Sequence, residues 1–471
     1  MANSVTQERA AKNPKAAVPI LLFSFVFCLI IDNGFKFMSQ PIADALNLSA
    51  NEVSLQATLP GIVIGIGAVV YAAMADAINI KKLMLLGIAL IAIGSLIGFF
   101  FSTSWYALLA GRLIQTSGLA AAETLYVIYV TKYLSREDQK TYLGFSTSAF
   151  QLALLLGTLA GGYVATYISW TAMFLIPLLM LLTVPAILKQ IPDEDATQSN
   201  LDVFGLFLIT VIATSTMLYM QEFRFWYLIP VVLGIGLFIW HINRNPKALV
   251  APEFFKNGRY VWAILLVLVV YSTQLGFILF LFPYAMSDLE GMTLDRASLM
   301  VAPGYACAVI VGALSGVIGK FMSSRVTIFA ALGGIIGSLA LAALTLGSGQ
   351  IPLIISVIIF ASSFALLYAP LVSTAIQNIP PAKSGVAIGF YNLTINIAIP
   401  VGIAYTAKLM DLRPSLFPSL ITAITPAESD TAIHYVSILL IITLIALAGS
   451  VIYFLADRVM TMKEKSAATV A

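Results

Sequence analysis

The sequence predicts an all-α integral membrane protein built from two six-helix bundles plus two extra helices, with fourteen transmembrane helices in all. Hydrophobic residues make up 60% of the 471 residues and charged residues only 10%, whereas soluble domains carry about 25% charged residues. The apolar residues fall in many separate runs, which excludes a protein held by a single anchor, and each spanning helix needs about 20 of them. These runs do not alternate with a period of two, so a transmembrane β-barrel is also excluded.

The spanning helices are predicted from apolar stretches bounded by charged or turn residues. The first six cover residues 17–46, 51–77, 80–102, 104–134, 137–168 and 169–190. A polar segment at 192–200 precedes two short stretches at 202–221 and 225–243, and six more follow at 258–288, 294–322, 325–348, 350–379, 384–410 and 431–457. We therefore expect an N-terminal six-helix bundle (1–190), a linker with two extra transmembrane helices (191–257) and a C-terminal six-helix bundle (258–471).

Basic residues orient the chain, because Lys and Arg gather in cytoplasmic loops. With the N-terminus inside and fourteen spans, 19 of the 25 basic residues fall in inner segments. The outer loops hold only Arg224, Arg296, Lys408 and Arg413. This distribution predicts a multi-pass protein of the bacterial cytoplasmic membrane with both termini in the cytoplasm.

Several functional classes do not fit the composition. The net charge of +3 is too mild to indicate a nucleic-acid partner. Two cysteines in apolar runs and two isolated histidines predict neither disulfides nor a metal site. No Ser/His, HExxH or paired-aspartate motif lies in the spans, so we do not expect an enzyme or a resident cofactor. A membrane sensor that binds without transporting remains an alternative, although the chain offers no soluble signalling domain.

Four ionisable residues fall deep within predicted spans: Asp32, Lys36, Arg112 and Glu123. Asp32 and Lys36 are four residues apart and share a helical face, as do Arg112 and Glu123, about three turns apart. One interpretation makes these two structural ion pairs. The other makes Asp32 and Glu123 proton carriers, with Arg112 and Lys36 tuning them or holding an anionic group, since a carboxylate in a dry site can exchange protons. We favour the second, because charges at mid-membrane are costly and commonly functional.

Polar and aromatic residues on other predicted spans could line a solute cavity. We expect Tyr126, Gln274, Tyr391, Asn392 and Asn396 to contribute to substrate binding. A cavity with aromatic and amide groups and few fixed charges suits an amphipathic organic solute. The alternative is that each residue makes helix–helix contacts only. Gly157, Gly161 and Gly162 in the fifth span predict either close helix packing or a bend used in gating.

Three stretches resemble motifs of the major facilitator superfamily. Residues 72–82 contain Asp76 followed by Lys81 and Lys82, similar to that superfamily's loop signature between helices two and three. Residues 112–118, from Arg112 through Gln115 to Gly118, resemble its fourth-helix motif R-x-x-q-G-x-G. Residues 31–36, read as I-D-N-G-F-K, look like the first helix of the fourteen-span drug/proton antiporters, and in particular of Gram-positive tetracycline efflux proteins of the staphylococcal chromosomal type.

The resemblance implies proton-coupled efflux of amphipathic compounds such as tetracyclines by a monomer, with no cofactor beyond the proton gradient and with a drug–Mg²⁺ chelate open as the transported form. It implies that Asp76, Lys81 and Lys82 act at the inner gate, that Arg112 works in proton coupling with the two acids, and that Lys36 and Gln115 contact substrate. Thr158 stands where the antiporter signature has proline, which leaves strict antiport or another coupling open. The alternative function is a secondary carrier for an endogenous lipid, fatty acid or metabolite.

Overall fold

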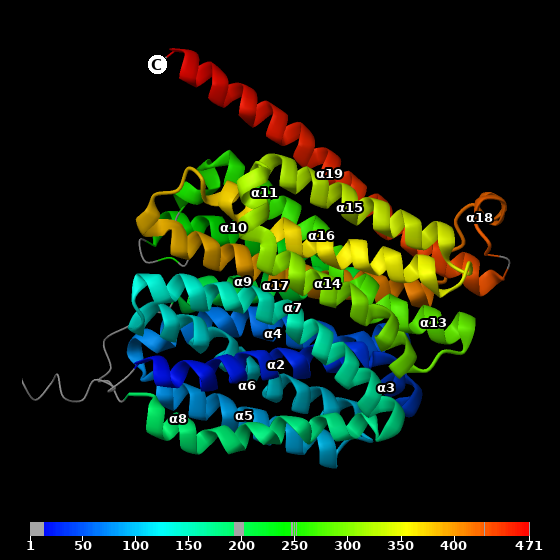
Figure 1. Ribbon diagram of the computed structural model, residues 1–471, viewed down its shortest axis with the longest axis horizontal. Coiled ribbons are helices and arrows are strands. Elements are labelled where there is room, and N and C mark those ends of the chain that lie inside the picture. Colours follow the sequence, from blue (N-terminus) through cyan, green and yellow to red (C-terminus); the bar gives the residue numbers. More distant parts are fainter. Residues whose placement is uncertain are drawn as a thin grey trace, which may run out of the picture.

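The protein is described here by a computed structural model, which covers residues 14–192, 202–245, 248, 250, 252–427 and 429–470. Within these residues the chain is helical and contains no strand (Figure 1). Fourteen helical stretches in the described part are long and apolar enough to cross a membrane, in agreement with the predicted number. The polar segment before the extra pair lies largely outside the description, which resumes at Asp202.

The N-terminal helices, blue to cyan-green in Figure 1, lie together on one side of the molecule. They are η1 (Pro14–Ala17), α2 (Val18–Phe37), α3 (Ser39–Leu46), α4 (Ala50–Ala77), α5 (Ile80–Phe100), α6 (Trp105–Tyr133), α7 (Arg136–Tyr167), η2 (Trp170–Phe174), η3 (Ile176–Thr183) and α8 (Val184–Gln190). Ser49 and Glu52 form a capping box that starts α4.

The first predicted span, 17–46, is divided between α2 and α3 at Met38. Pro41 has no backbone N–H for the carbonyl of Phe37, which weakens the helix there. Two residues earlier, the carbonyl of Phe35 accepts a hydrogen bond of 2.9 Å from the Gln56 side chain on α4. The break therefore fixes the end of α2 just beyond Asp32 and Lys36.

The two extra helices are α9 (Val203–Glu222) and α10 (Leu228–Arg244), joined by η4 (Phe225–Tyr227). Asp202 caps α9 by accepting from the Gly205 N–H at 3.0 Å, and its carboxylate also bonds His241 of α10 at 2.7 Å. α9 lies between α4 and α17 (Pro381–Leu412), where its residues Ala213 and Met217 are buried with Ile62 and Ala404. Through α9, the extra pair therefore contacts both halves of the molecule.

The C-terminal helices, green to red in Figure 1, form the other side. They are η5 (Pro252–Lys256), α11 (Gly258–Val270), α12 (Ser272–Leu275), the π-helical η6 (Gly276–Leu281), α13 (Phe282–Glu290), α14 (Leu294–Phe321), α15 (Ser324–Thr345), α16 (Gln350–Ile376), α17, α18 (Pro418–Ile424) and α19 (Asp430–Val470). The predicted span 258–288 is thus interrupted by a π-helix. Short π-helical turns inside longer helices are found frequently at functional sites.

We call the end at which α2 begins and α19 finishes the terminal end, and the other the opposite end. In Figure 1 α19 projects beyond the bundle at the terminal end, while α3, α13 and α18 lie at the opposite end. The spans alternate in direction between these ends. Asp32 lies in the half of α2 that is nearer the opposite end, and its side chain is buried.

Candidate functional site

Asp32 is the centre of a buried charge cluster that joins two helices of the N-terminal half. Its carboxylate bonds Lys36 one turn further along α2, and accepts from the Arg112 guanidinium of α6, with 3.1 Å between Oδ1 and Nη2. Asp32 is 2% exposed and Arg112 is fully buried. Breaking such a buried pair is costly because it leaves a charge without its partner.

Arg112 is held in place from three sides. Its Nη1 donates to Gln115 Oε1 at 2.5 Å, and the Gln115 amide in turn donates to Ser95 Oγ of α5 at 2.9 Å. The Phe35 ring lies under the guanidinium, 4.1 Å from its centre, at the distance of a cation–π contact. The Arg112 Nε, by contrast, is buried without a partner among the described residues. The chain Asp32–Arg112–Gln115–Ser95 therefore links α2, α6 and α5.

Glycines bring α5 and α6 close enough for this chain to form. A methyl group on Gly111 would lie 2.7 Å from the backbone nitrogen of Gly98, and one on Gly118 would lie 2.9 Å from the backbone nitrogen of Ile91. Any larger side chain at these positions would push the helices apart. The close approach puts Ser95 within reach of Gln115, which a wider helix spacing would not allow.

Glu123 does not pair with Arg112, contrary to one of the two interpretations drawn from the sequence. Eleven residues of α-helix separate them by about 16 Å, too far for their side chains to meet although they share a face. Arg112 bonds Asp32 of a neighbouring helix instead. Glu123 is half-buried and makes no hydrogen bond or ion pair within the part of the chain that the structure describes.

The residues expected to bind substrate occupy different surroundings. Gln115 and Lys36 belong to the charge cluster. Tyr126 is fully buried, and its hydroxyl donates to the Tyr142 carbonyl at 2.7 Å. Tyr391 is fully buried in the C-terminal half near Tyr368.

The three amide side chains also differ in their contacts. Asn392 accepts a hydrogen bond from the Tyr368 hydroxyl at 2.9 Å, and Gln274 is buried on α12. Asn396 faces α4, because a methyl group on Gly65 would meet its Cβ at 2.9 Å. The structure thus brings Asp32, Lys36, Arg112 and Gln115 together. Tyr368, Tyr391 and Asn392 lie together in the C-terminal half, whereas Asn396 packs against α4.

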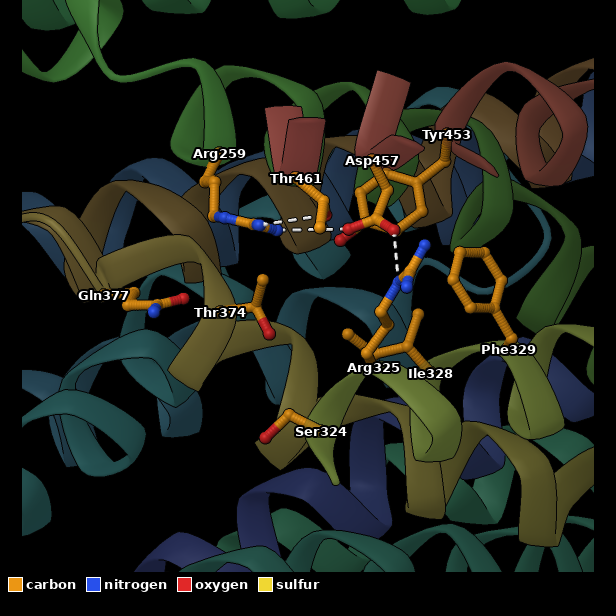
Figure 2. A pocket seen from close by; sticks show the side chains of 10 residues that line it. All are labelled: Arg259, Ser324, Arg325, Ile328, Phe329, Thr374, Gln377, Tyr453, Asp457 and Thr461. Carbon is orange, nitrogen blue, oxygen red and sulfur yellow. Dashed lines mark hydrogen bonds and ion pairs between the residues drawn. The ribbon is translucent and has the colours of Figure 1, made fainter. Parts of the chain in front are cut away.

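A second cluster of charged residues, not anticipated from the sequence, lies at the terminal end of the C-terminal half (Figure 2). Asp457 of α19 bonds Arg259 of α11 at 3.1 Å and Arg325 of α15 at 2.6 Å. Arg259 also pairs with Glu464 at 2.6 Å. The cluster borders a cavity of about 200 Å³. Hydrogen bonds from the Arg259 guanidinium lower the pKa of the Glu464 carboxyl.

The sequence and the arrangement of helices are similar to those of known membrane proteins. A sequence profile of the Major Facilitator Superfamily matches residues 21–403, more than half of the chain. The chain belongs to the Major Facilitator Superfamily. It is therefore a multi-pass membrane carrier rather than an enzyme, and its fold is that of the superfamily's transporters.

Relatives within the Major Facilitator Superfamily are distant. The MdtD protein of Yersinia enterocolitica, which carries a provisional multidrug-resistance name, is 22% identical over 456 residues, covering 92% of this chain and 94% of that protein. The riboflavin transporter RibZ of Clostridioides difficile is 20% identical, covering 83% and 87%. Among solved structures, the peptide-transporter-family protein PepTSo has a TM-score of 0.69 at 12% identity, covering 96% of this chain and 99% of its own. A bacterial homologue of the lysosomal transporter Spinster, described as inward-facing, has a TM-score of 0.65 at 14% identity, covering 95% and 98%.

The residues of the predicted loop motif lie at the end of α4 and the start of α5. Asp76 is in α4, but its side chain lies outside the described part. Lys81 is largely buried at the start of α5 and Lys82 is exposed. The pattern of glycines in α7 serves packing: Gly157 and Gly161 lie against Gly34 of α2, and Gly162 lies against Ser298 of α14.

The proline position of the antiporter signature, occupied by Thr158, keeps α7 helical. The Thr158 hydroxyl is buried and donates to the Leu154 carbonyl of its own helix at 2.6 Å. A hydrogen bond of this kind from Ser or Thr often bends a helix slightly. Thr158 therefore sits between the two glycine contacts without breaking the backbone ladder.

Sequence reasoning missed three residues that support the cluster: Ser95, Phe35 and Gln56. Ser95 and Gln56 each carry a signal in hindsight, because each is a polar residue inside an apolar stretch and polar groups there need partners. Phe35 gave no such signal among many aromatic residues. Which helix would supply the partner depends on the packing of α2, α4, α5 and α6, and a single sequence does not contain it.

Proposed function

We propose that this carrier exports amphipathic organic compounds in exchange for protons across the bacterial cytoplasmic membrane, with tetracyclines as the first candidates. The observation that carries the proposal is the Asp32 carboxylate, enclosed between Lys36 and Arg112 inside a membrane bundle. A carboxylate at that depth is costly to keep, and such residues commonly serve as proton relays. The multidrug-resistance name of the MdtD relative agrees with a drug-like substrate.

Exchange follows from the charges of this cluster. When Asp32 is ionised, it occupies both cations. A solute that binds to the ionised Asp32 carboxylate and its two cations would lose this contact when a proton cancels the charge of Asp32. A bound solute would in turn hinder protonation of Asp32, so the proton and the solute compete. Proton and solute thereby alter each other's binding at one site, which is the thermodynamic requirement for coupling.

Glu123 is proposed as the second proton carrier. It lies further along α6 toward the terminal end, and it makes no ion pair with the described residues. A half-buried carboxylate without a bound cation can take up a proton without first breaking an ion pair. Protons would therefore pass between Asp32 and the terminal end by way of Glu123.

We place the terminal end in the cytoplasm, because 19 of the 25 basic residues then fall in cytoplasmic segments. Both termini would be cytoplasmic, and one chain would suffice for transport, since the charge cluster is complete within a single copy. A drug–Mg²⁺ chelate stays open as the transported form.

The test is drug-driven proton movement in proteoliposomes that contain the purified protein and a pH-sensitive dye. We expect Asp32→Asn to reduce tetracycline-driven proton flux at least about tenfold and Glu123→Gln to reduce it less. Glu222→Gln, a carboxylate at the end of α9 near the surface, is the matched control and should behave as the parent. Undiminished flux in both Asp32→Asn and Glu123→Gln would remove the proposal of proton coupling.

A second candidate is a secondary carrier for an endogenous lipid, fatty acid or metabolite. The charge cluster favours it in one respect, because two cations face one carboxylate and leave a surplus positive charge for an anionic group. The riboflavin transporter among the relatives is also named for a metabolite. A competition experiment distinguishes the two candidates. A fatty acid that abolishes tetracycline-driven proton flux, and that drives a larger proton flux by itself, would be the better substrate.

A further inference from the structure

The two halves of the molecule are in close contact near the opposite end. There, α7 meets α14: a methyl group on Gly162 would lie 2.6 Å from Ser298 Oγ and 3.0 Å from the Leu294 carbonyl. On the other side of the molecule α4 meets α17, with Gly61 against Pro400 and Gly65 against Asn396. Glycines in both pairs let a helix of one half pack closely against a helix of the other.

The same helix faces are open toward the terminal end. Gly316 lies eighteen residues, or five full turns, beyond Ser298 on α14, so it points in the same direction. Gly389 on α17 lies seven and eleven residues before Asn396 and Pro400, again on their face. A methyl group on Gly316 or Gly389 would meet nothing within 4 Å. The halves therefore diverge from the opposite end toward the terminal end.

Hydrogen bonds across the halves reinforce the closed end. The Tyr167 hydroxyl at the end of α7 donates to Asp295 Oδ2 in the first turn of α14, at 2.9 Å. The Asp295 backbone N–H donates to Thr166 Oγ1 at 3.2 Å. A carboxylate in the first turn of a helix is also favoured by the helix dipole, so Asp295 is a strong acceptor at this place.

Only one of the two Asp295 carboxylate oxygens is hydrogen-bonded in this closed end, among the described residues. Asp295 is 6% exposed, yet its Oδ1 has no hydrogen-bond partner among the described residues. A buried carboxylate oxygen without a partner lowers the net gain of closure, because its desolvation is not repaid. A contact of this kind holds the halves together but can be undone, as a carrier that opens alternately to both sides requires.

We propose that Tyr167 and Asp295 form the latch that keeps the opposite end closed, and that losing it shifts the carrier toward the state open at that end. Tyr167 belongs to the N-terminal half and Asp295 to the C-terminal half, so the bond exists only while the halves are together. This latch is independent of the proposed substrate and of proton coupling.

The test uses Ser298→Cys as a reporter in a protein whose two native cysteines, Cys28 and Cys307, are replaced by alanine. Ser298 is fully buried against Gly162 in the closed state. Its thiol should therefore react slowly with a bulky polar maleimide in lipid nanodiscs, where both faces are accessible. Tyr167→Phe removes only the hydroxyl and should raise the labelling rate roughly three- to tenfold, the effect of one partly exposed hydrogen bond.

Two controls make the outcome decisive. Tyr163→Phe is the matched control one turn earlier on α7. The Tyr163 ring lies 5.6 Å from the Tyr167 ring, and among the described residues its hydroxyl makes no hydrogen bond to Asp295, so this variant should leave labelling unchanged. Gly316→Cys, placed on the open face, should label fast in the parent and more slowly with Tyr167→Phe, because opening one end closes the other. Equal labelling of the parent and Tyr167→Phe, or an equal rise with Tyr163→Phe, would overturn the proposal. A rise at both reporters would indicate loosening of the fold rather than a latch and would overturn it as well.

Discussion

Arg112 donates to the carboxylate of Asp32 at 3.1 Å, joining α6 to α2 across 80 residues of sequence. The bond fixes the position of a fully buried cation of the N-terminal half. Everything else in the cluster is arranged around it: Gln115 and Phe35 hold the guanidinium, and Lys36 holds the second carboxylate oxygen.

Arg112→Gln should abolish proton-coupled transport and lower stability. It leaves Asp32 with Lys36 alone, and removing one partner of a buried ion pair costs about 3–5 kcal/mol. Thermal unfolding in detergent and flux in proteoliposomes measure the two effects. Arg224→Gln, at an exposed arginine near the opposite end, should change neither. Parental flux in Arg112→Gln would contradict a coupling role for the cluster.

Ser95→Ala should reduce transport moderately while the protein stays folded. The Ser95 hydroxyl accepts from the Gln115 amide, and its loss leaves Gln115 free to turn away from Arg112, at a cost of about 1 kcal/mol. The distinctive readout is the pH profile of transport, which should shift because Arg112 loses the support of Gln115 while it stays bonded to Asp32. Ser24→Ala is the matched control, since that buried hydroxyl bonds its own helix at Ile20. An unchanged profile would show that Gln115 is positioned without Ser95.

Asp457→Asn should destabilise the terminal end of the C-terminal half by about 3 kcal/mol, because Arg259 would lose a buried partner. Arg325→Gln should cost about 1 kcal/mol or less, since half of the Arg325 side chain is exposed and its ion pair is screened. Thermal unfolding of both variants compares the two. Equal losses would mean that Arg325, not Arg259, is the main partner of Asp457.

Asp44→Asn should raise thermal stability at neutral pH. Burial, and then the charge of Asp288 in the C-terminal half, raise the pKa of Asp44. An acid whose pKa is raised in the folded protein destabilises the fold when ionised, and this penalty is relieved as pH falls through the raised pKa. The gain in Tm from Asp44→Asn should therefore be largest at neutral pH and shrink as the pH falls toward 3.8, the ordinary pKa of an aspartate. A gain of constant size at all pH values would indicate a packing effect instead.

The number, order and approximate limits of the membrane helices could be predicted from the sequence. A run of about 20 apolar residues indicates a membrane helix by itself, without knowledge of its neighbours. The four deep charges could be found in the same way. Their partners could not. Asp32 and Lys36 share one helix, so their contact follows from periodicity, but Asp32 and Arg112 meet only because glycines set the spacing of neighbouring helices.

The positions at which a membrane span is interrupted could not be predicted from the pattern of apolar residues either. The π-helical segment 276–281 lies in a continuous apolar run whose composition is the same in α- and π-helices. It arises where Gly276 lies close to the Gly402 carbonyl of α17, 3.1 Å from a methyl group placed on that glycine. The two tyrosines of the C-terminal half near Asn392 show the same limit, since their apolar neighbours do not reveal which way each hydroxyl points.

The extra helix α9 touches α4 and α17 at once, through the buried residues Ile62, Met217 and Ala404. If the two halves rotate about each other, this three-way contact must slide on at least one side. The extra helix α9 therefore covers the contact between the two halves on this side of the molecule. A solute that approaches sideways from the bilayer on this side would meet α9 before it reached the contact between α4 and α17.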